Sequence, residues 1–78
     1  MKYTVYSKTS CPFCVKVVKA LQLAKVEYNE LKLDTDFTRE EFISKFGRST
    51  FPRVLLNNET LLGGCNETVQ YLRENKLL

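Results

Sequence analysis

A chain of 78 residues has room for one small domain, expected to span residues 1–78, and 44% hydrophobic residues mark it as globular rather than disordered. The net charge of +3, from 12 basic and 9 acidic residues, is too small for a nucleic-acid-binding surface. Because no apolar run approaches the ~18 residues of a membrane span and a strand pattern begins almost at once, we expect no membrane segment, no signal peptide and a cytoplasmic location.

The first part of the chain has the pattern of a strand, a helix and a second strand. Residues 2–7 (KYTVYS) are rich in β-forming residues and predict a central strand with Tyr3 and Val5 on one face. Residues 12–24 predict a helix, because apolar residues recur there at helical spacing. These apolar residues are Val17, Ala20, Leu21 and Ala24. Residues 26–33 predict a strand parallel to the first, since a helix separates the two.

A helix-start signature follows in the middle of the chain. Thr38 is the predicted N-cap, Glu41 reaches back to it from the third helical position, and Phe37 packs on Phe42. Gly47 is placed to end this helix in a left-handed conformation. The predicted buried residues of the helix are Phe42, Ile43 and Phe46.

The last part of the chain predicts a β-hairpin and a helix. Residues 53–56 and 59–62 are expected to form antiparallel strands joined by an Asn-Asn turn. A Gly-Gly pair breaks the second strand, and a helix begins at Cys65 or Asn66 and runs to about residue 75. Its predicted buried residues are Val69 and Leu72. The order βαβαββα predicts an α/β fold.

The strongest chemical signal is the pair Cys11 and Cys14 at the start of the first predicted helix. Unpaired N–H groups and the helix dipole favour an anion there, so Cys11 is expected to ionise more readily than a free thiol. Pro12 suits the first helical position, where no N–H is needed. Because Cys14 lies one turn further on, we predict that Cys11 attacks a disulfide and Cys14 resolves the mixed disulfide.

Three motifs on this order of elements resemble those of the glutaredoxins, over essentially the whole chain. They are CPFC at residues 11–14 before a helix, TFP at 50–52 before a strand, and GGCN at 63–66 before the last helix. The resemblance implies a thioredoxin fold, with a four-stranded mixed sheet flanked by three helices. It also implies reduction of protein disulfides and glutathione mixed disulfides, with glutathione as co-substrate and no metal.

The resemblance further implies where glutathione would bind. Pro52 matches the family's cis-proline, which turns the backbone of Phe51 toward the active-site sulfur, so that Phe51 pairs with the ligand as an extra strand. Lys8 and Arg39 match the cations for the glycine carboxylate. The N–H groups at the start of the last helix match the cradle for the γ-glutamyl carboxylate, and Gly64 allows close approach. The implied glutathione site is Lys8, Phe13, Arg39, Thr50, Phe51, Pro52, Gly64, Cys65 and Asn66.

Three residues depart from the family's usual pattern. Phe51 replaces a β-branched residue beside the ligand, where the backbone hydrogen bonds should survive. Asn66 replaces an aspartate, which keeps an acceptor for the ligand amine but loses the charge. We therefore expect glutathione affinity to be several-fold weaker, unless Glu67 supplies the charge. Phe13 replaces the commoner tyrosine and loses only a hydroxyl group, from which we expect little.

Plainer interpretations exist for some of these residues. Lys8 and Arg39 also fit solvated surface positions, and only the motif match favours a binding role. Cys65 is predicted to be structural, as a small residue at a helix cap. Arg48 and Arg53 are predicted to be surface or partner-facing charges.

Two other functions stay open at this point. A thioredoxin-reductase-dependent redoxin of the same fold would need no glutathione site, so Lys8, Arg39 and the GGCN motif argue against it. A glutathione-ligated iron–sulfur cluster shared by two chains is known in the family, but Pro12 argues against it. We expect a monomer whose partners are glutathione and disulfide-bonded or glutathionylated proteins. Ribonucleotide reductase is a common partner in the family.

Overall fold

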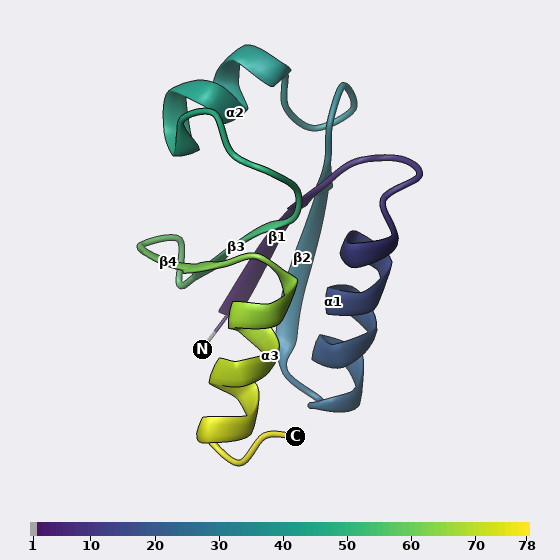
Figure 1. Cartoon of the computed structure of the whole chain (residues 1–78), viewed down its shortest axis with the longest axis vertical. Helices are drawn as coiled ribbons and strands as arrows, with labels where there is room; N and C mark the ends of the chain where they lie inside the picture. Colours follow the sequence, from purple (N-terminus) through teal and green to yellow (C-terminus); the bar gives the residue numbers. More distant parts are fainter. Residues whose placement is uncertain (1) are drawn as a thin grey trace.

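The computed structural model describes residues 2–78, which form a four-stranded sheet and three helices (Figure 1). The elements in chain order are β1 (Lys2–Ser7), α1 (Pro12–Leu23), β2 (Glu27–Lys32), α2 (Arg39–Phe46), β3 (Arg53–Leu56), β4 (Thr60–Gly63) and α3 (Cys65–Glu74). This is the order predicted from the sequence, and the predicted boundaries lie close to the observed ones. Among the described residues, no helix combines the length and the apolar character needed to cross a bilayer.

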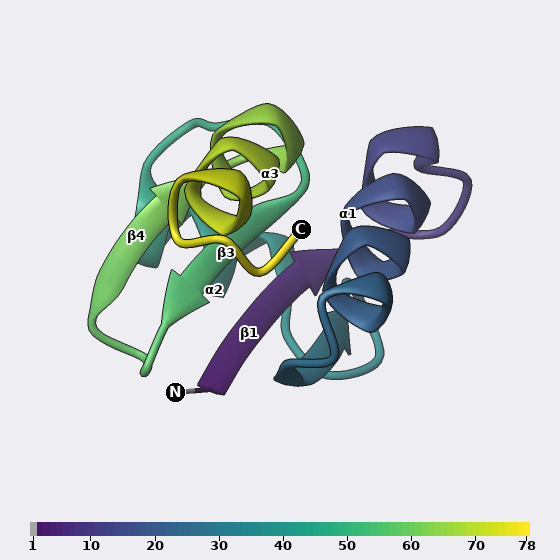
Figure 2. The ribbon, with the colours of Figure 1, turned by 90° about the horizontal axis from the view of Figure 1, so that it is seen from below.

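The sheet has the strand order β2-β1-β3-β4, so β1 is central as predicted. β1 pairs in parallel with β2, because α1 carries the chain back to the start of the sheet between them. β1 also pairs antiparallel with β3, and β3 with β4, so the sheet is mixed. Helices α1 and α3 lie side by side over one face of the sheet (Figure 2).

The hydrophobic core lies between this face and the two helices. Period-2 alternation along β1 turns Tyr3 and Val5 toward α1 and α3, and neither side chain is accessible to solvent. The predicted apolar residues of α1 pack against these two side chains. The buried core residues are Tyr3, Val5, Val17, Ala20, Leu21, Val54, Leu56, Cys65 and Leu72, and Ala24 and Val69 pack partly buried against them.

The hairpin turn between β3 and β4 is fastened to β1. Asn57 and Asn58 both adopt positive φ, at 57° and 60°, which asparagine tolerates better than most residues. The Asn57 side-chain oxygen accepts the N–H of Lys2 at 2.9 Å, and that of Asn58 accepts the Thr4 hydroxyl at 2.9 Å. The two asparagines therefore set the turn and help to hold β1 in register with the hairpin.

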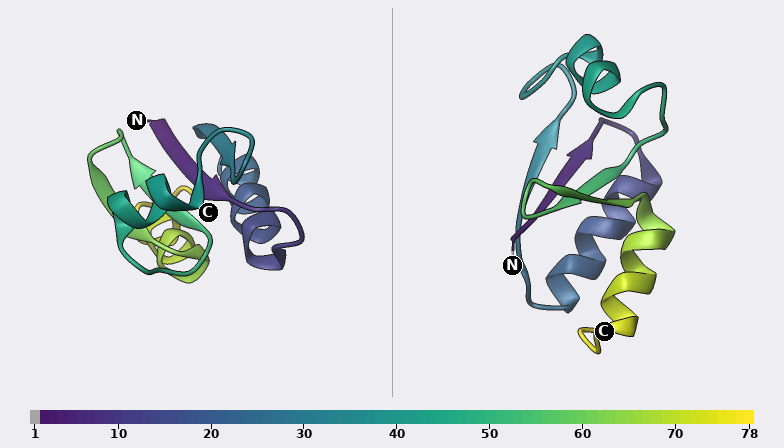
Figure 3. Two further views of the ribbon diagram at one scale, coloured as in Figure 1. Left: turned by 90° about the horizontal axis from the view of Figure 1, so that it is seen from above. Right: turned by 90° about the vertical axis from the view of Figure 1, so that its left-hand side faces the viewer.

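Helix α2 begins with the capping box predicted from the sequence. The Thr38 hydroxyl accepts the N–H of Glu41 at 3.1 Å, and the Glu41 carboxylate accepts the N–H of Thr38 at 2.8 Å. The rings of Phe37 and Phe42 stack at 6.0 Å between centroids, which confirms the predicted hydrophobic contact. The helix lies beyond the carboxyl end of β1, at the same end of the molecule as the loop that follows this strand (Figures 1 and 3).

Three predictions about α2 differ from the structure. Ile43 is 37% exposed, because it follows Phe42 by one residue, about 100° around the helix and away from the aromatic side chains that α2 packs against. Phe46 is only partly buried. Gly47 ends the helix with a positive φ of 74°, but its ψ of −168° is extended, so the chain leaves without a left-handed helical turn.

We expect Thr38→Ala to lower the free energy of unfolding by about 1 kcal/mol, because the N–H of Glu41 loses its acceptor at the start of α2. Urea unfolding followed by circular dichroism measures the change. Thr35→Ala, at an exposed turn residue, is the matched control and should change stability by less than about 0.5 kcal/mol. Equal effects of the two substitutions would contradict a capping role for Thr38.

Candidate active site

The two cysteines of the CPFC motif form a disulfide at the N-terminus of α1. Cys11 is the N-cap residue and Cys14 lies in the first turn, with their Cα atoms 5.2 Å apart. The backbone N–H of Cys14 donates to the Cys11 sulfur at 3.2 Å, and Pro12 occupies the first turn without a donor of its own. When the disulfide is reduced, the Cys11 sulfur therefore becomes a thiol that already accepts a hydrogen bond from a helix N–H.

The disulfide is largely covered. Cys11 is 6% exposed and Cys14 is 2% exposed, so the first cysteine is the more accessible of the two. Ser10, directly before the pair, has a φ of 59°, and this turn brings the chain from the end of β1 to the start of α1. The small difference in exposure agrees with the predicted roles, in which Cys11 attacks the substrate and Cys14 resolves the mixed disulfide.

A cavity of about 570 Å³ opens beside Cys11. Residues from four parts of the chain meet there: the loop after β1, the start of α1, the start of α2 and the segment before β3. The lining residues are Lys8, Ser10, Cys11, Pro12, Phe13, Arg39, Ser49, Thr50 and Phe51. The structure therefore brings both predicted cations, Lys8 and Arg39, to the same cavity as the nucleophile.

A second, smaller cavity of about 220 Å³ shares Phe13, Thr50 and Phe51 with the first, so the two form one cleft. Its remaining lining residues are Pro52, Arg53, Gly64, Cys65, Asn66 and Glu67. The peptide bond between Phe51 and Pro52 is cis, as the resemblance implies. Every residue of the implied glutathione site lines this cleft, and Cys14 lies behind Cys11 outside it.

The cleft also contains residues outside the implied glutathione site. Arg53, which is predicted to be a surface or partner-facing charge, lines the smaller cavity, and its Nε donates to the carbonyl of Pro52 at 3.1 Å. Ser10 and Ser49 line the larger cavity. The position of Arg53 directly after the cis-proline was the one signal that could have suggested its role, since the side chain follows the backbone that turns into the cleft.

Glu67 holds the start of α3. Its carboxylate accepts the N–H of Gly64 at 2.7 Å, which satisfies the N-cap donor that a glycine cannot satisfy with a side chain. A methyl group on Gly63 would lie 2.9 Å from the Glu67 side chain, and Gly63 has a φ of 121°, so glycine is required there. A methyl group on Gly64 would come within 3.1 Å of the Arg53 guanidinium.

The first turn of α3 presents its free donors to the cleft. Cys65 and Asn66 are the first two helical residues, and the N–H groups at these positions have no partner within a helix. The Cys65 side chain points the other way and belongs to the hydrophobic core. Burial, with a smaller contribution from Glu67 and against an opposing one from Lys16, raises the pKa of the Cys65 thiol above its ordinary value.

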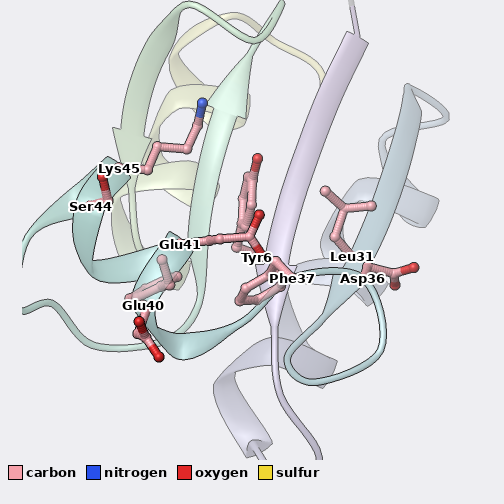
Figure 4. Close-up of a pocket in the computed structure, with 9 residues that line it drawn as sticks. Tyr6, Leu31, Asp36, Phe37, Glu40, Glu41, Ser44 and Lys45 are labelled. Atoms are coloured by element: carbon pink, nitrogen blue, oxygen red, sulfur yellow. The ribbon is translucent and has the colours of Figure 1, made fainter.

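A larger cavity of about 720 Å³ lies on the other side of α2 and carries none of the predicted site residues (Figure 4). It is lined by Tyr6, Leu31, Asp36, Phe37, Glu40, Glu41, Phe42, Ser44 and Lys45. Two of its carboxylates already serve the backbone: Asp36 accepts the N–H of Lys32 at 2.9 Å, and Glu41 caps α2. Burial and the nearby Glu41 carboxylate raise the pKa of Tyr6. No cysteine is among the described residues that line this cavity, whereas Cys11 lines the cleft.

Known proteins are similar to this chain along most of its length. The family model for glutaredoxin matches residues 3–61. Glutaredoxin-C6 of Oryza sativa subsp. japonica is 35% identical over 78 residues, which cover 95% of this chain and 69% of that protein. Glutaredoxin 1 of Rickettsia prowazekii (strain Madrid E) is 33% identical over 76 residues, 94% of this chain and 79% of that one. A crystal structure of a buckwheat glutaredoxin–glutathione complex has a TM-score of 0.78 at 26% identity, covering 96% of this chain and 71% of that chain.

A four-stranded mixed sheet with three helices, carrying a cysteine pair at a helix start, defines a thiol–disulfide oxidoreductase with the thioredoxin fold. Both the fold and the cysteine pair were predicted from the sequence. The family model and the relatives then make the assignment specific: this chain belongs to the glutaredoxin family.

In the reduced protein at neutral pH, we expect iodoacetamide to modify Cys11 and to leave Cys65 unmodified until the protein is unfolded. The two cysteines are about equally buried, but the raised pKa of Cys65 moves its thiolate formation to higher pH than in a free cysteine. The Cys11 thiolate is instead stabilised by the N–H of Cys14 at the start of α1. Mass spectrometry of peptides alkylated before and after urea treatment measures both sites, with a free cysteine peptide as the reference. Similar labelling of both cysteines in the folded protein would contradict this assignment.

Proposed function

We propose that this protein is a glutathione-dependent oxidoreductase that reduces glutathione mixed disulfides and protein disulfides. The observation that carries the proposal is the meeting of Lys8, Arg39 and the first turn of α3 in one cleft with Cys11. Glutathione has two carboxylates, and this cleft offers side-chain cations at one end and helix N–H groups at the other. The buckwheat relative, whose structure is a complex with glutathione, supports the same ligand class.

In the proposed binding mode, the sulfur of glutathione lies against Cys11. Lys8 and Arg39 bind the glycine carboxylate, the N–H groups of Cys65 and Asn66 bind the γ-glutamyl carboxylate, and the backbone of Phe51 pairs with the cysteine residue of the ligand. Thr50, Pro52 and Gly64 shape the cleft, and Phe13 covers one side. The ligand amine meets the neutral Asn66 and, at the start of α3, the Glu67 carboxylate that also caps Gly64.

The proposed reaction is thiol–disulfide exchange. The Cys11 thiolate attacks the glutathione sulfur of a mixed disulfide, forms a Cys11–glutathione disulfide and releases the substrate as a thiol. A second glutathione then attacks this disulfide, regenerates the Cys11 thiolate and leaves as oxidised glutathione. With a protein disulfide, Cys11 instead forms a bond to the substrate, and Cys14 displaces the substrate to close the Cys11–Cys14 disulfide. Two electrons pass to the substrate in either route, and we propose that the protein works as a cytoplasmic monomer.

We expect Cys11→Ser to abolish both activities, whereas Cys14→Ser should keep deglutathionylation and lose most protein disulfide reduction, because only the second reaction needs the resolving thiol. The assay couples the protein to glutathione, glutathione reductase and NADPH, with a small glutathione mixed disulfide or a disulfide-bonded protein as substrate. Equal losses in both variants on both substrates would refute the division of roles. No turnover by the unaltered protein would refute the glutathione site, and thioredoxin reductase would then be tested as the donor.

We expect Asn66→Asp to lower the KM for the glutathione mixed disulfide about fivefold, because a carboxylate binds the ligand amine more strongly than an amide by roughly 1 kcal/mol. The same coupled assay measures the change. Asn29→Asp, on the exposed edge strand β2, adds the same charge away from the cleft and should leave KM unchanged. An unaltered KM in Asn66→Asp would show that Glu67 already supplies the charge.

A further inference from the structure

The ring of Phe51 packs onto α2. It stacks on the ring of Phe42 at 4.2 Å between centroids with an interplanar angle of 14°, and lies nearly parallel to Phe37 at 6.2 Å. These three rings belong to an aromatic cluster that also contains Tyr6 and Phe46. Phe51 therefore joins the backbone beside the disulfide to the helix that begins at Arg39.

The same ring carries a cation from the active-site loop. The ammonium of Lys8 lies over Phe51, 5.5 Å from the ring centroid. The Phe51 ring thus contacts both the Phe42 ring and the Lys8 ammonium. The negative face of an aromatic ring attracts a cation at this separation, and Lys8 and Phe51 both line the cavity beside Cys11.

Phe51 differs from the rest of the cluster in what it borders. Tyr6, Phe37 and Phe42 line the larger cavity on the far side of α2, labelled in part in Figure 4, and Phe51 lines both cavities of the cleft. Its ring thus forms the boundary between the aromatic cluster and the site of the disulfide. The usual residue at this position of the motif is β-branched. It has no ring, so it could make neither the contact with Phe42 nor the contact with Lys8.

We propose that the Phe51 side chain is a positioning residue for the two cations of the cleft. It holds the Lys8 ammonium directly, and through Phe42 it holds the first turn of α2, which carries Arg39. An unconstrained lysine side chain loses rotamer entropy when it binds a carboxylate. Because the ring already confines the Lys8 ammonium in the free protein, less entropy is lost when the ligand binds. This inference rests on the proposed function, in which both cations bind the glycine carboxylate.

The first test separates positioning from folding. Phe51→Leu should raise the KM for a small glutathione mixed disulfide about two- to fivefold with kcat little changed, since the lost cation–aromatic attraction acts on binding alone. Phe51→Tyr keeps a ring and should restore the lower KM. The matched control is Phe46→Leu, which removes another ring of the same cluster, one that is tilted against Phe42 and meets Tyr6 edge to face. An equal rise of KM in Phe46→Leu would overturn the proposal.

The second test asks whether Phe51 acts through Lys8. In a Lys8→Met background, Phe51→Leu should raise KM by a clearly smaller factor than in the unaltered protein, because the ammonium it positions is gone. Only the part transmitted through α2 and Arg39 would then be left. Independent effects, in which the two factors simply multiply, would overturn the link between Phe51 and Lys8.

The third test needs no activity, so it distinguishes failure of this proposal from failure of the proposed function. A ring close to the end of Lys8 shifts the proton resonances of the lysine side-chain methylenes upfield. Nuclear magnetic resonance of the oxidised protein should show this shift, its loss in Phe51→Leu and its return in Phe51→Tyr. Ordinary random-coil shifts for Lys8 in the unaltered protein would overturn the proposal even if the enzyme were active. Shifted resonances in a protein without glutathione-dependent turnover would refute the proposed function alone.

Discussion

The N-terminus of α1 is the constraint on which the rest of the structure depends. β1 is buried between two neighbouring strands, and α1 packs on it through Val17 and Leu21, which have no accessible surface. The helix start therefore has little freedom to move relative to the sheet. Because the N–H of Cys14 points at the Cys11 sulfur, a negative charge on that sulfur is stabilised by groups that are already in place. The reactive thiol depends on a helix start that the hydrophobic core holds in place. The other elements contribute the residues that line the cleft beside Cys11.

Helix α2 is attached in a different way from α1 and α3. It has 8 residues and lies beyond the end of the strands, so it cannot bury a long apolar stripe against the sheet (Figure 3). Its attachment is the aromatic cluster, in which Phe42 stacks on Phe51 and Phe46 meets Tyr6 edge to face. Aromatic rings bury a large area for each residue, which suits a short helix with few contacts to share. The position of Arg39 in the cleft follows from this packing and from the capping box beside it.

The charges are distributed unequally around the aromatic cluster. Lys8, Arg39 and Arg53 line the cleft, together with the positive end of α3 and the single carboxylate of Glu67. The carboxylates of Asp36, Glu40 and Glu41 instead line the cavity on the far side of α2 (Figure 4). The cleft therefore has more basic than acidic side chains in its lining, whereas the cavity on the far side of α2 has three carboxylates and the ammonium of Lys45. Charge alone thus favours an anion in the cleft over one in the cavity on the far side of α2.

Features that depend on near neighbours in the chain were predictable from the sequence. Four features each specify local geometry within a few residues: the alternation in β1, the capping box at Thr38, the asparagine turn and the proline after Cys11. The motifs at 11–14, 50–52 and 63–66 indicated the family and most of the cleft. Features that depend on which distant segments meet were not predictable. The exposure of Ile43 reflects which side of α2 the cluster covers, and Arg53 enters the cleft only because β3 lies beside the start of α3. The ring of Phe51 contacts Phe42 and Lys8 for the same reason: side-chain direction in a packed core is set by long-range neighbours, which no local pattern encodes.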